Sequence, residues 1–417
     1  MPCRPEKMEI SRRPIYGIAW ARAAVAAAVC CVALLTIQAT LEAVEPLPLI
    51  GYTEFRTNLP GGRHANVRTM RAMMVRRDGS QRSEVIPRLV DDPDSWTQFA
   101  GWSPDGRLAI VARGWQSPDN AAWEETHKTF RFTAEAWSLD SFLVDLVSRV
   151  ATNVTGVDRV SFHNGGLFFW PRDATKLGFT ALIDGNSHPF RMDLDGRNKV
   201  DLTSESKEFA YGFSGAPDGR RIAYHKSYQI YLADADGTNT VRIETGNPFN
   251  FAPSWSPDGK WLLFVSGEHY NCHPHLVRSD GAGLRKVADR GTYRGVTEFL
   301  DVFDFHGGSS DIPIWSADGA SIFYTAKVGI DEGSPVELFR IAMDGEPVRL
   351  TVSKVGTTHY HPQPSQDGQW LLYGSKRDGV RHLYLQRLAD SGETRVTSHA
   401  QGTGAMWGHW QPVPGNP

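Results

Sequence analysis

The chain has 417 residues, with 44 basic and 47 acidic side chains and a formal net charge of −3. This near balance leaves no surplus of positive charge and argues against a nucleic-acid-binding protein. The 40 glycines, 25 prolines and 11% aromatic residues are typical of a protein with many short strands joined by tight turns.

The first segment of the chain differs from the rest. Five basic residues between Arg4 and Arg22 precede an apolar run at 23–37, and small residues follow at Ala39 and Ala43. This order is that of a secretory signal. The apolar run is shorter than the roughly 20 residues that a membrane span needs. We therefore predict a cleaved signal peptide at 1–39, with an uncleaved membrane anchor as the alternative.

Loss of this signal peptide would leave Cys272 as the remaining one of four cysteines, so no internal disulfide could form. We predict an exported protein, periplasmic or extracellular, with a linker at 40–49, a folded domain at 50–413 and a tail at 414–417. It would meet a membrane only through its N-terminal segment, if that segment is retained.

A short motif recurs along the folded domain. WSPDG stands at 102–106 and again at 255–259, each time before a run of large apolar residues. Weaker copies are WSADG at 315–319, APDG at 216–219, SQDG at 365–368 and WPRDA at 170–174. A repeat at this period indicates a modular architecture in which each copy is one supersecondary unit.

A second pattern follows each motif, as in HLVRSDGAGLRKV at 275–287. It reads as two alternating strands around an Asp-Gly turn, which suits a tight hairpin because glycine tolerates positive φ. One repeat therefore predicts four antiparallel strands. Such a sheet cannot bury both faces alone, and radial stacking of the repeats solves this, which is the β-propeller.

The two chain ends decide the number of blades. Residues 50–85 read as strands two to four without a first strand, and residues 406–413 read as a first strand with nothing after it. We predict that they complete one blade together. The fold class is then an all-β propeller of seven four-stranded blades, closed by pairing of the chain ends so that no sheet edge stays open. A six-bladed ring is the alternative.

The WSPDG-type motif resembles that of the TolB-like β-propeller repeat family, and the resemblance extends over about 50–413. It implies an exported propeller. The chain contains no G-x-S-x-G segment, so a serine hydrolase of the prolyl-oligopeptidase type is not predicted.

The turn pattern predicts which loops share a face of the ring. Pro-Asp-Gly links strands one and two, and Asp-Gly links strands three and four, so both turns lie on one face, the short-turn face. Links between strands two and three, and links between blades, lie on the opposite face, the long-loop face. We expect all 14 histidines on the long-loop face and predict that it is the working face.

Some of these histidines are candidates for a metal site near the axis. His359 and His361 directly precede an innermost strand, and imidazoles arriving from several blades suit a divalent ion such as Mn²⁺ or Zn²⁺ or acid–base chemistry. The alternative is that they cap strand ends by hydrogen bonds. The candidate metal ligands are His306, His359, His361, His273 and His275.

The pair His359 and His361 is similar to the His-x-His pair of oligogalacturonate lyases, which are seven-bladed propellers with a metal held near the axis. This resemblance implies a metal-dependent polysaccharide lyase that acts on acidic sugars, with His306, His273 or His275 as a further ligand. In that case we expect an arginine from the Arg63 loop to neutralise the substrate carboxylate.

The loop at 56–71 supplies arginines to the long-loop face. Guanidinium groups bind carboxylates or phosphates through paired hydrogen bonds, although solvated loop charges are the alternative. The candidate ligand-binding residues are Arg63, His64, Arg68, Arg71, His269 and His409. The first predicted function is an exported monomer that binds a protein or an envelope polysaccharide through the long-loop face, and the alternative is the lyase.

Overall fold

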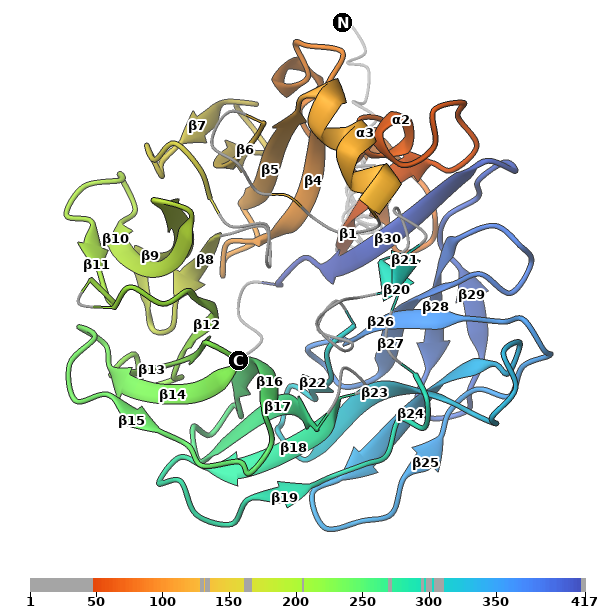
Figure 1. Cartoon of the computed structure of the whole chain (residues 1–417). Coiled ribbons are helices and arrows are strands. Elements are labelled where there is room, and N and C mark those ends of the chain that lie inside the picture. The colour runs from red at the N-terminus through yellow and green to blue at the C-terminus, as the bar shows by residue number, and fades with distance from the viewer. Residues whose placement is uncertain are drawn as a thin grey trace, which may run out of the picture. The chain divides into compact units, whose positions relative to one another are not determined.

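The structure is a computed structural model that describes most of the chain from Pro48 to Val413. Seven four-stranded antiparallel sheets surround a common centre, which confirms the predicted all-β propeller and its blade count (Figure 1). The described residues are 48–127, 131, 136–160, 167–204, 206–268, 272–293, 296–297, 302–303 and 311–413.

The blades are built from consecutive strands, with the innermost strand first, except in blade one. Blade one consists of β1 (Leu49–Arg56), β2 (Arg71–Arg76), β3 (Ser83–Glu84) and β30 (Thr403–Trp410). Blade two consists of β4 (Ser95–Trp102), β5 (Leu108–Gln116), β6 (Trp137–Asp145) and β7 (Ala151–Asn153). Blade three consists of β8 (Leu167–Trp170), β9 (Asp173–Ile183), β10 (Asn186–Asp193) and β11 (Val200–Asp201).

The remaining blades repeat the same order. Blade four consists of β12 (Ala210–Gly215), β13 (Arg221–Lys226), β14 (Gln229–Asp234) and β15 (Val241–Arg242). Blade five consists of β16 (Phe249–Trp255), β17 (Trp261–Gly267), β18 (His273–Arg278) and β19 (Arg285–Lys286). Blade six consists of β22 (Ile314–Trp315), β23 (Ser321–Lys327), β24 (Val336–Ala342) and β25 (Val348–Arg349). Blade seven consists of β26 (His359–Pro364), β27 (Trp370–Ser375), β28 (His382–Arg387) and β29 (Glu393–Arg395).

The ring is closed by the two ends of the domain. The last strand, β30, pairs antiparallel with β1, from Ile50 opposite Trp410 to Arg56 opposite Thr403. Blade one therefore takes its innermost strand from the C-terminal end and its other three strands from the N-terminal end (Figure 1). This is the predicted closure, and it pairs the innermost strand of blade one with β1.

The Ser-x-Asp-Gly turns satisfy their own polar groups. In blade five, Ser256 Oγ donates to Asp258 at 2.7 Å, and the backbone N–H of Trp261 donates to Ser256 Oγ at 3.0 Å. The Ser256 hydroxyl holds the pKa of the Asp258 carboxyl below its usual value. The same pattern occurs at Ser103–Asp105, Ser316–Asp318 and Ser365–Asp367. These local hydrogen bonds stabilise the motif as an Asx-type turn.

The motif tryptophans join neighbouring blades. An indole N–H donates to a backbone carbonyl near the end of the innermost strand of the preceding blade. These bonds run from Trp102 to His409 (3.1 Å), from Trp315 to Ser254 (3.4 Å) and from Trp410 to Gln363 (3.0 Å).

Apolar side chains fill the space between blades, whereas the outer rim is kept short. Ile50 and Tyr52 of blade one, for example, form one buried cluster with Leu372 and Leu383 of blade seven. The outermost strands β3, β11, β15, β19 and β25 have two residues each. Such short edges offer little backbone for pairing with another chain.

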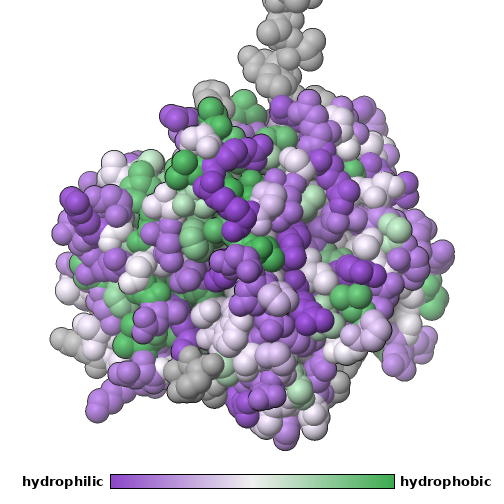
Figure 2. All heavy atoms as spheres, turned by 90° about the horizontal axis from the view of Figure 1, so that it is seen from above, coloured by the Kyte–Doolittle hydropathy of each residue, from purple (hydrophilic) through white to green (hydrophobic). Residues whose placement is uncertain are grey.

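Four described elements lie outside this repeat. They are α2 (Gly62–Val67), η1 (Pro87–Leu89), α3 (Pro118–His127) and the two-stranded ribbon of β20 (Val296–Thr297) and β21 (Val302–Phe303). Within the described ranges, no helix has the length and apolar character needed to cross a bilayer. The side of the molecule in Figure 2 is mainly hydrophilic, with apolar side chains in several groups.

Candidate functional site

The two inserted helices lie together over blades one and two on the long-loop face (Figure 1). The backbone N–H of His64, in α2, donates to Glu125 of α3 at 3.0 Å. His64 Nε2 and Arg68 Nη1 both contact Asp94 Oδ1, at 3.3 and 3.4 Å. The Arg68 side chain remains 40% exposed. The structure therefore brings His64 and Arg68 together, and Arg68 can contact a ligand.

Arg71 is held by the protein itself. Its Nη1 donates to the carbonyls of Arg68 and Met70 at 2.9 and 2.8 Å, and its Nε lies 3.9 Å from Glu84. Burial lowers the pKa of Arg71 below its usual value. These contacts favour a role in fixing the loop that carries α2. Arg63 lies in α2, and His269 lies outside the described residues.

Histidines recur in three blades at one position near the start of the third strand, two residues before its first pair with the fourth strand. The strand registers place His188, His273 and His382 at this position, and Glu337 occupies it in blade six. In blade five, the backbone N–H of Arg290 donates to His273 Nδ1 at 3.1 Å. The equivalent bond in blade seven joins His399 N to His382 Nδ1 at 3.3 Å.

His273 and His382 therefore cap the link to the next blade. A buried backbone N–H needs a hydrogen-bond acceptor, and the unprotonated nitrogen of a neutral imidazole supplies one. Part of the predicted gathering of histidines on the long-loop face is explained by this recurring cap. Burial lowers the pKa values of His273 and His382 and so favours the neutral form that accepts.

His275 is also engaged within its own blade. Its Nδ1 lies 2.9 Å from the carbonyl of His273, and its ring stacks on Phe264 with the centroids 5.9 Å apart. Burial lowers its pKa.

His359 is fully buried between blades six and seven. Its Nε2 lies 2.9 Å from Ser353 Oγ and 3.5 Å from Glu337, which is also fully buried. Its ring meets Tyr373 edge-on with the centroids 5.4 Å apart. Burial lowers the pKa of His359 to about 4. These contacts give one ring nitrogen a protein partner.

His361 lies at a bulge of the innermost strand β26, where its φ is 52°. A left-handed φ is uncommon for a residue other than glycine and needs support from its surroundings. Asp311 supplies it, because Oδ1 accepts the His361 backbone N–H at 2.9 Å. The neighbouring innermost strand has the same conformation at Trp407, whose ring lies 6.2 Å from that of His361.

Asp311 belongs to a buried polar group that was not predicted. Its Oδ2 accepts hydrogen bonds from Tyr293 at 3.0 Å and from Thr325 at 2.6 Å. Arg290 Nη2 lies 3.8 Å from the same oxygen, and both charged side chains have no exposed surface. The sequence contains a signal for this group. Asp311 stands four residues before Trp315, where the blade-five repeat has Phe251.

No three His, Cys, Asp or Glu side chains within the described ranges come together in a way that suits a metal ion. His306 lies outside those ranges, so the predicted metal set as a whole remains a prediction. Among its described members, His359 contacts Glu337 and Ser353 whereas His361 lies beside Asp311.

His409 lies away from the long-loop face, which differs from our expectation. It is the penultimate residue of β30, near the end that leads to the short-turn face. The reason is that the sequence copy at 406–413 begins inside the strand and not at its start. Burial, with a smaller effect of His361, lowers the pKa of His409 to about 4.

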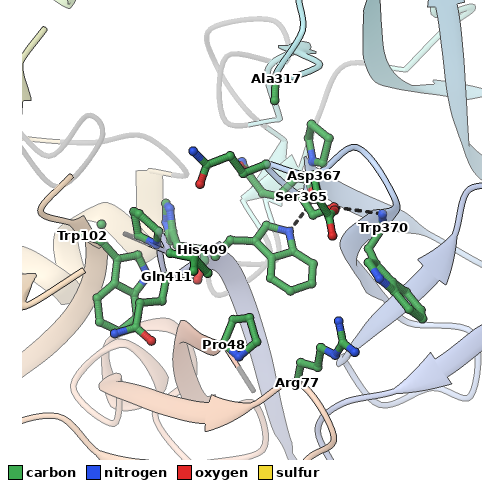
Figure 3. A pocket seen from close by; sticks show the side chains of 16 residues that line it. Pro48, Arg77, Trp102, Ala317, Ser365, Asp367, Trp370, His409 and Gln411 are labelled. Carbon is green, nitrogen blue, oxygen red and sulfur yellow. Dashed lines mark hydrogen bonds between the residues drawn. The ribbon is translucent and has the colours of Figure 1, made fainter. Parts of the chain in front are cut away.

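A pocket of about 390 Å³ opens beside His409 on the short-turn face (Figure 3). The Asp367 turn, Trp102 and Arg77 are among its lining groups. The Arg77 guanidinium stacks on Trp370, 5.2 Å from the ring centroid. The repeat motif gave no signal for this pocket, because its walls come from blades that are distant in sequence.

The chain is a seven-bladed β-propeller, and comparison with known proteins describes its repeats further. They are TolB-like: TolB of Mannheimia succiniciproducens, a Tol-Pal system protein, is 43% identical over 75 residues, which cover 16% of this chain and 17% of that protein. An uncharacterized protein of Agrobacterium fabrum is 26% identical over 195 residues, covering 45% of this chain and 62% of that protein. These findings confirm the predicted resemblance to the TolB-like repeat family.

A solved structure of an oligogalacturonate lyase in complex with manganese has a similar fold. It superimposes with a TM-score of 0.53 at 14% identity, covering 84% of this chain and 85% of that one. At this identity the likeness concerns the fold. No family model matches the chain. The chain spans less than two thirds of the curated relatives that it matches.

Proposed function

We propose that this protein is an exported propeller that binds a partner, a protein or an envelope polysaccharide, through its long-loop face. The observation that carries this proposal is the asymmetry between the two faces. Apart from the pocket beside His409, the described part of the short-turn face is built mainly of repeated turns, such as that of Ser256 and Asp258, whose polar groups bond to one another. The long-loop face carries the two inserted helices α2 and α3.

The inserted helices support binding because they form a built surface. α2 is fixed to α3 through the bond from His64 N to Glu125, and Asp94 holds both His64 and Arg68. A surface that is positioned before binding loses less conformational entropy when a partner docks. The partly exposed side chain of Arg68 adds a group of a kind that recognises carboxylates.

Photo-crosslinking from defined positions tests this proposal. A photoreactive amino acid at Arg68, on the long-loop face, should give a discrete covalent adduct in cells that produce the full chain. The same amino acid at Asp78, in a turn of the short-turn face, serves as the matched control. Equal labelling from both positions, or none from Arg68, would contradict binding through the long-loop face.

The export part of the proposal has its own test. Mass spectrometry of the protein from a fractionated cell should find the chain outside the cytoplasm and without residues 1–39. A full-length chain in the membrane fraction would support the uncleaved anchor. A full-length chain in the cytoplasm would refute export.

A metal-dependent polysaccharide lyase is the second candidate. The likeness in fold to the manganese-bound oligogalacturonate lyase supports it, as does the His359–His361 pair. Metal analysis of the purified protein, compared with the His361→Ala variant, tests it. Stoichiometric Mn²⁺ or Zn²⁺ that is lost in the variant, with formation of an unsaturated product from polygalacturonate, would support the lyase. Absence of metal from the parent protein would end it.

A further inference from the structure

Three highly exposed aliphatic side chains lie on two neighbouring loops of the long-loop face at blade six. Ile330 is 89% exposed, Val352 is 85% exposed and Val355 is 77% exposed. Apart from Val147, at 87%, no other large apolar side chain in the described ranges is more than 58% exposed. Three of the four most exposed apolar side chains thus come from one blade. We call Ile330, Val352 and Val355 the aliphatic pad.

The two loops that form the pad are joined to each other. Ile330 lies in the link between β23 and β24, and the valines lie in the link between β25 and β26. The backbone N–H of Gly356 donates to the carbonyl of Gly333 at 2.8 Å. A Cβ built on Gly333 would lie 3.1 Å from Val355 Cγ1, so the loops touch at this point.

The valine loop is fixed from beneath by a buried carboxylate. Glu337 has no exposed surface and accepts the Ser353 backbone N–H at 2.7 Å and Arg349 Nη2 at 2.9 Å. The hydroxyls of Thr351 and Ser353 also donate to Glu337. A buried carboxylate with this many donors holds its surroundings firmly, because each donor would be left unpaired if the loop moved.

In this loop the polar side chains therefore point inward and the apolar ones point outward. Thr351 and Ser353 turn their hydroxyls inward to Glu337, whereas Val352 and Val355 point into solvent. Single exposed apolar residues are normal on protein surfaces. A group of them on fixed loops exposes apolar surface that the protein does not bury itself, which is typical of a binding site.

The charges around the pad indicate the kind of partner. Asp331 and Glu332 are exposed beside Ile330, and Lys354 is exposed between the valines. A second copy of this chain, docked by two-fold symmetry, would bring two such net acidic patches together. A segment with aliphatic side chains flanked by lysine or arginine complements both the pad and its acids.

We propose that the aliphatic pad docks a segment of a partner protein that presents aliphatic side chains flanked by basic ones. This rests on the proposed function, of which it names the contact and the chemistry. Glu337 acts in it as a positioning residue that keeps Val352 and Val355 outward.

Selection from a peptide display library on the full chain tests the pad. We expect the enriched peptides to carry two or more aliphatic residues next to lysine or arginine. Binding of a synthetic enriched peptide, measured by fluorescence anisotropy, should weaken at least tenfold in the triple variant Ile330→Ser, Val352→Ser, Val355→Ser. The matched control is Val147→Ser, an equally exposed valine in a turn of the short-turn face, which should leave the affinity unchanged.

Further measurements separate the outcomes. Asp331→Asn with Glu332→Gln should weaken binding several-fold at low salt, and the difference should shrink as salt rises. Thermal unfolding of the triple variant should match that of the parent, because the replaced side chains are exposed. The proposal would be overturned if enriched peptides bound the triple variant with the same affinity as the parent, or if selection gave no enrichment of aliphatic residues next to basic ones.

Two results would redirect the inference. If sedimentation velocity shows the parent self-associating and the triple variant not, the occupant is a second copy and the partner segment is refuted. If Arg68 crosslinks to a partner that the triple variant still binds, the pad fails while binding through the long-loop face stands.

Discussion

The buried pair of Arg290 and Asp311 allows a quantitative prediction. Both side chains are inaccessible to solvent, and Arg290 Nη2 lies 3.8 Å from Asp311 Oδ2. With an effective dielectric constant of about 20, unit charges at this distance attract by about 4 kcal/mol. The variant Asp311→Asn keeps the shape but removes the negative charge, so Arg290 would be left buried without its counter-charge.

We expect Asp311→Asn to lower the free energy of unfolding by about 3–5 kcal/mol, since breaking a buried pair on one side leaves an uncompensated charge. The acceptor for His361 N is retained in part by the amide oxygen. The exposed Asp331, changed to Asn, is the control and should alter stability by less than about 0.5 kcal/mol.

Urea unfolding followed by intrinsic fluorescence measures these values. The double variant Arg290→Met with Asp311→Asn should cost at least about 2 kcal/mol less than the sum of the two single variants, because the second change removes the charge that the first one left alone. Additive costs, or a cost below about 1 kcal/mol for Asp311→Asn, would refute the reasoning that the two charges stabilise each other.

Three further predictions concern pH, the motif tryptophans and ring closure. Burial lowers the pKa of His399 from 6.5 to about 4, so the unfolded chain binds this proton more readily, and stability is fully present above about pH 6.5 and falls as pH drops towards 4. The His399 side chain is 2% exposed. Urea unfolding at pH 7.5 and pH 4 should show that the free energy of unfolding decreases by about 3 kcal/mol less in His399→Gln than in the parent. Trp102→Phe should lower the free energy of unfolding by about 1 kcal/mol more than Trp255→Phe. Both rings are buried, but the indole N–H of Trp255 has no acceptor within the described ranges, whereas that of Trp102 donates to His409. Equal destabilisation in thermal unfolding would contradict the blade-to-blade bond. Deletion of residues 403–417 removes β30 and leaves β1 as an open edge, so the protein should aggregate, and a soluble monomer with unchanged circular dichroism would refute closure by the chain ends.

The fold was predictable because it depends on short-range rules that the sequence repeats. The WSPDG copies determine where the first turn of a blade falls, since Ser256 and Asp258 satisfy the turn within a few residues. Closure followed from counting strands: an incomplete copy at each end predicts one shared blade. The pairing of β1 with β30 confirms this.

The candidate site was less predictable, because side-chain partners depend on contacts between blades. The spacing of His359 and His361 suggests two ligands on one strand, yet the bulge at His361 and the carboxylate of Glu337 give the two side chains different partners. Neither Glu337 nor Asp311 is near them in sequence. The pocket beside His409 was missed for the same reason.

A single change within the repeat connects the histidine caps to the aliphatic pad. At the start of the third strand, a histidine accepts one backbone N–H of the following link, as His382 does from His399. Blade six has Glu337 at that position, and its two oxygens accept from four donors. Because a carboxylate accepts more hydrogen bonds than a neutral imidazole, it draws the polar side chains of the link inward. The valines of the link are then left outside, so the position that holds a capping histidine in blades five and seven is associated with an exposed apolar surface in blade six.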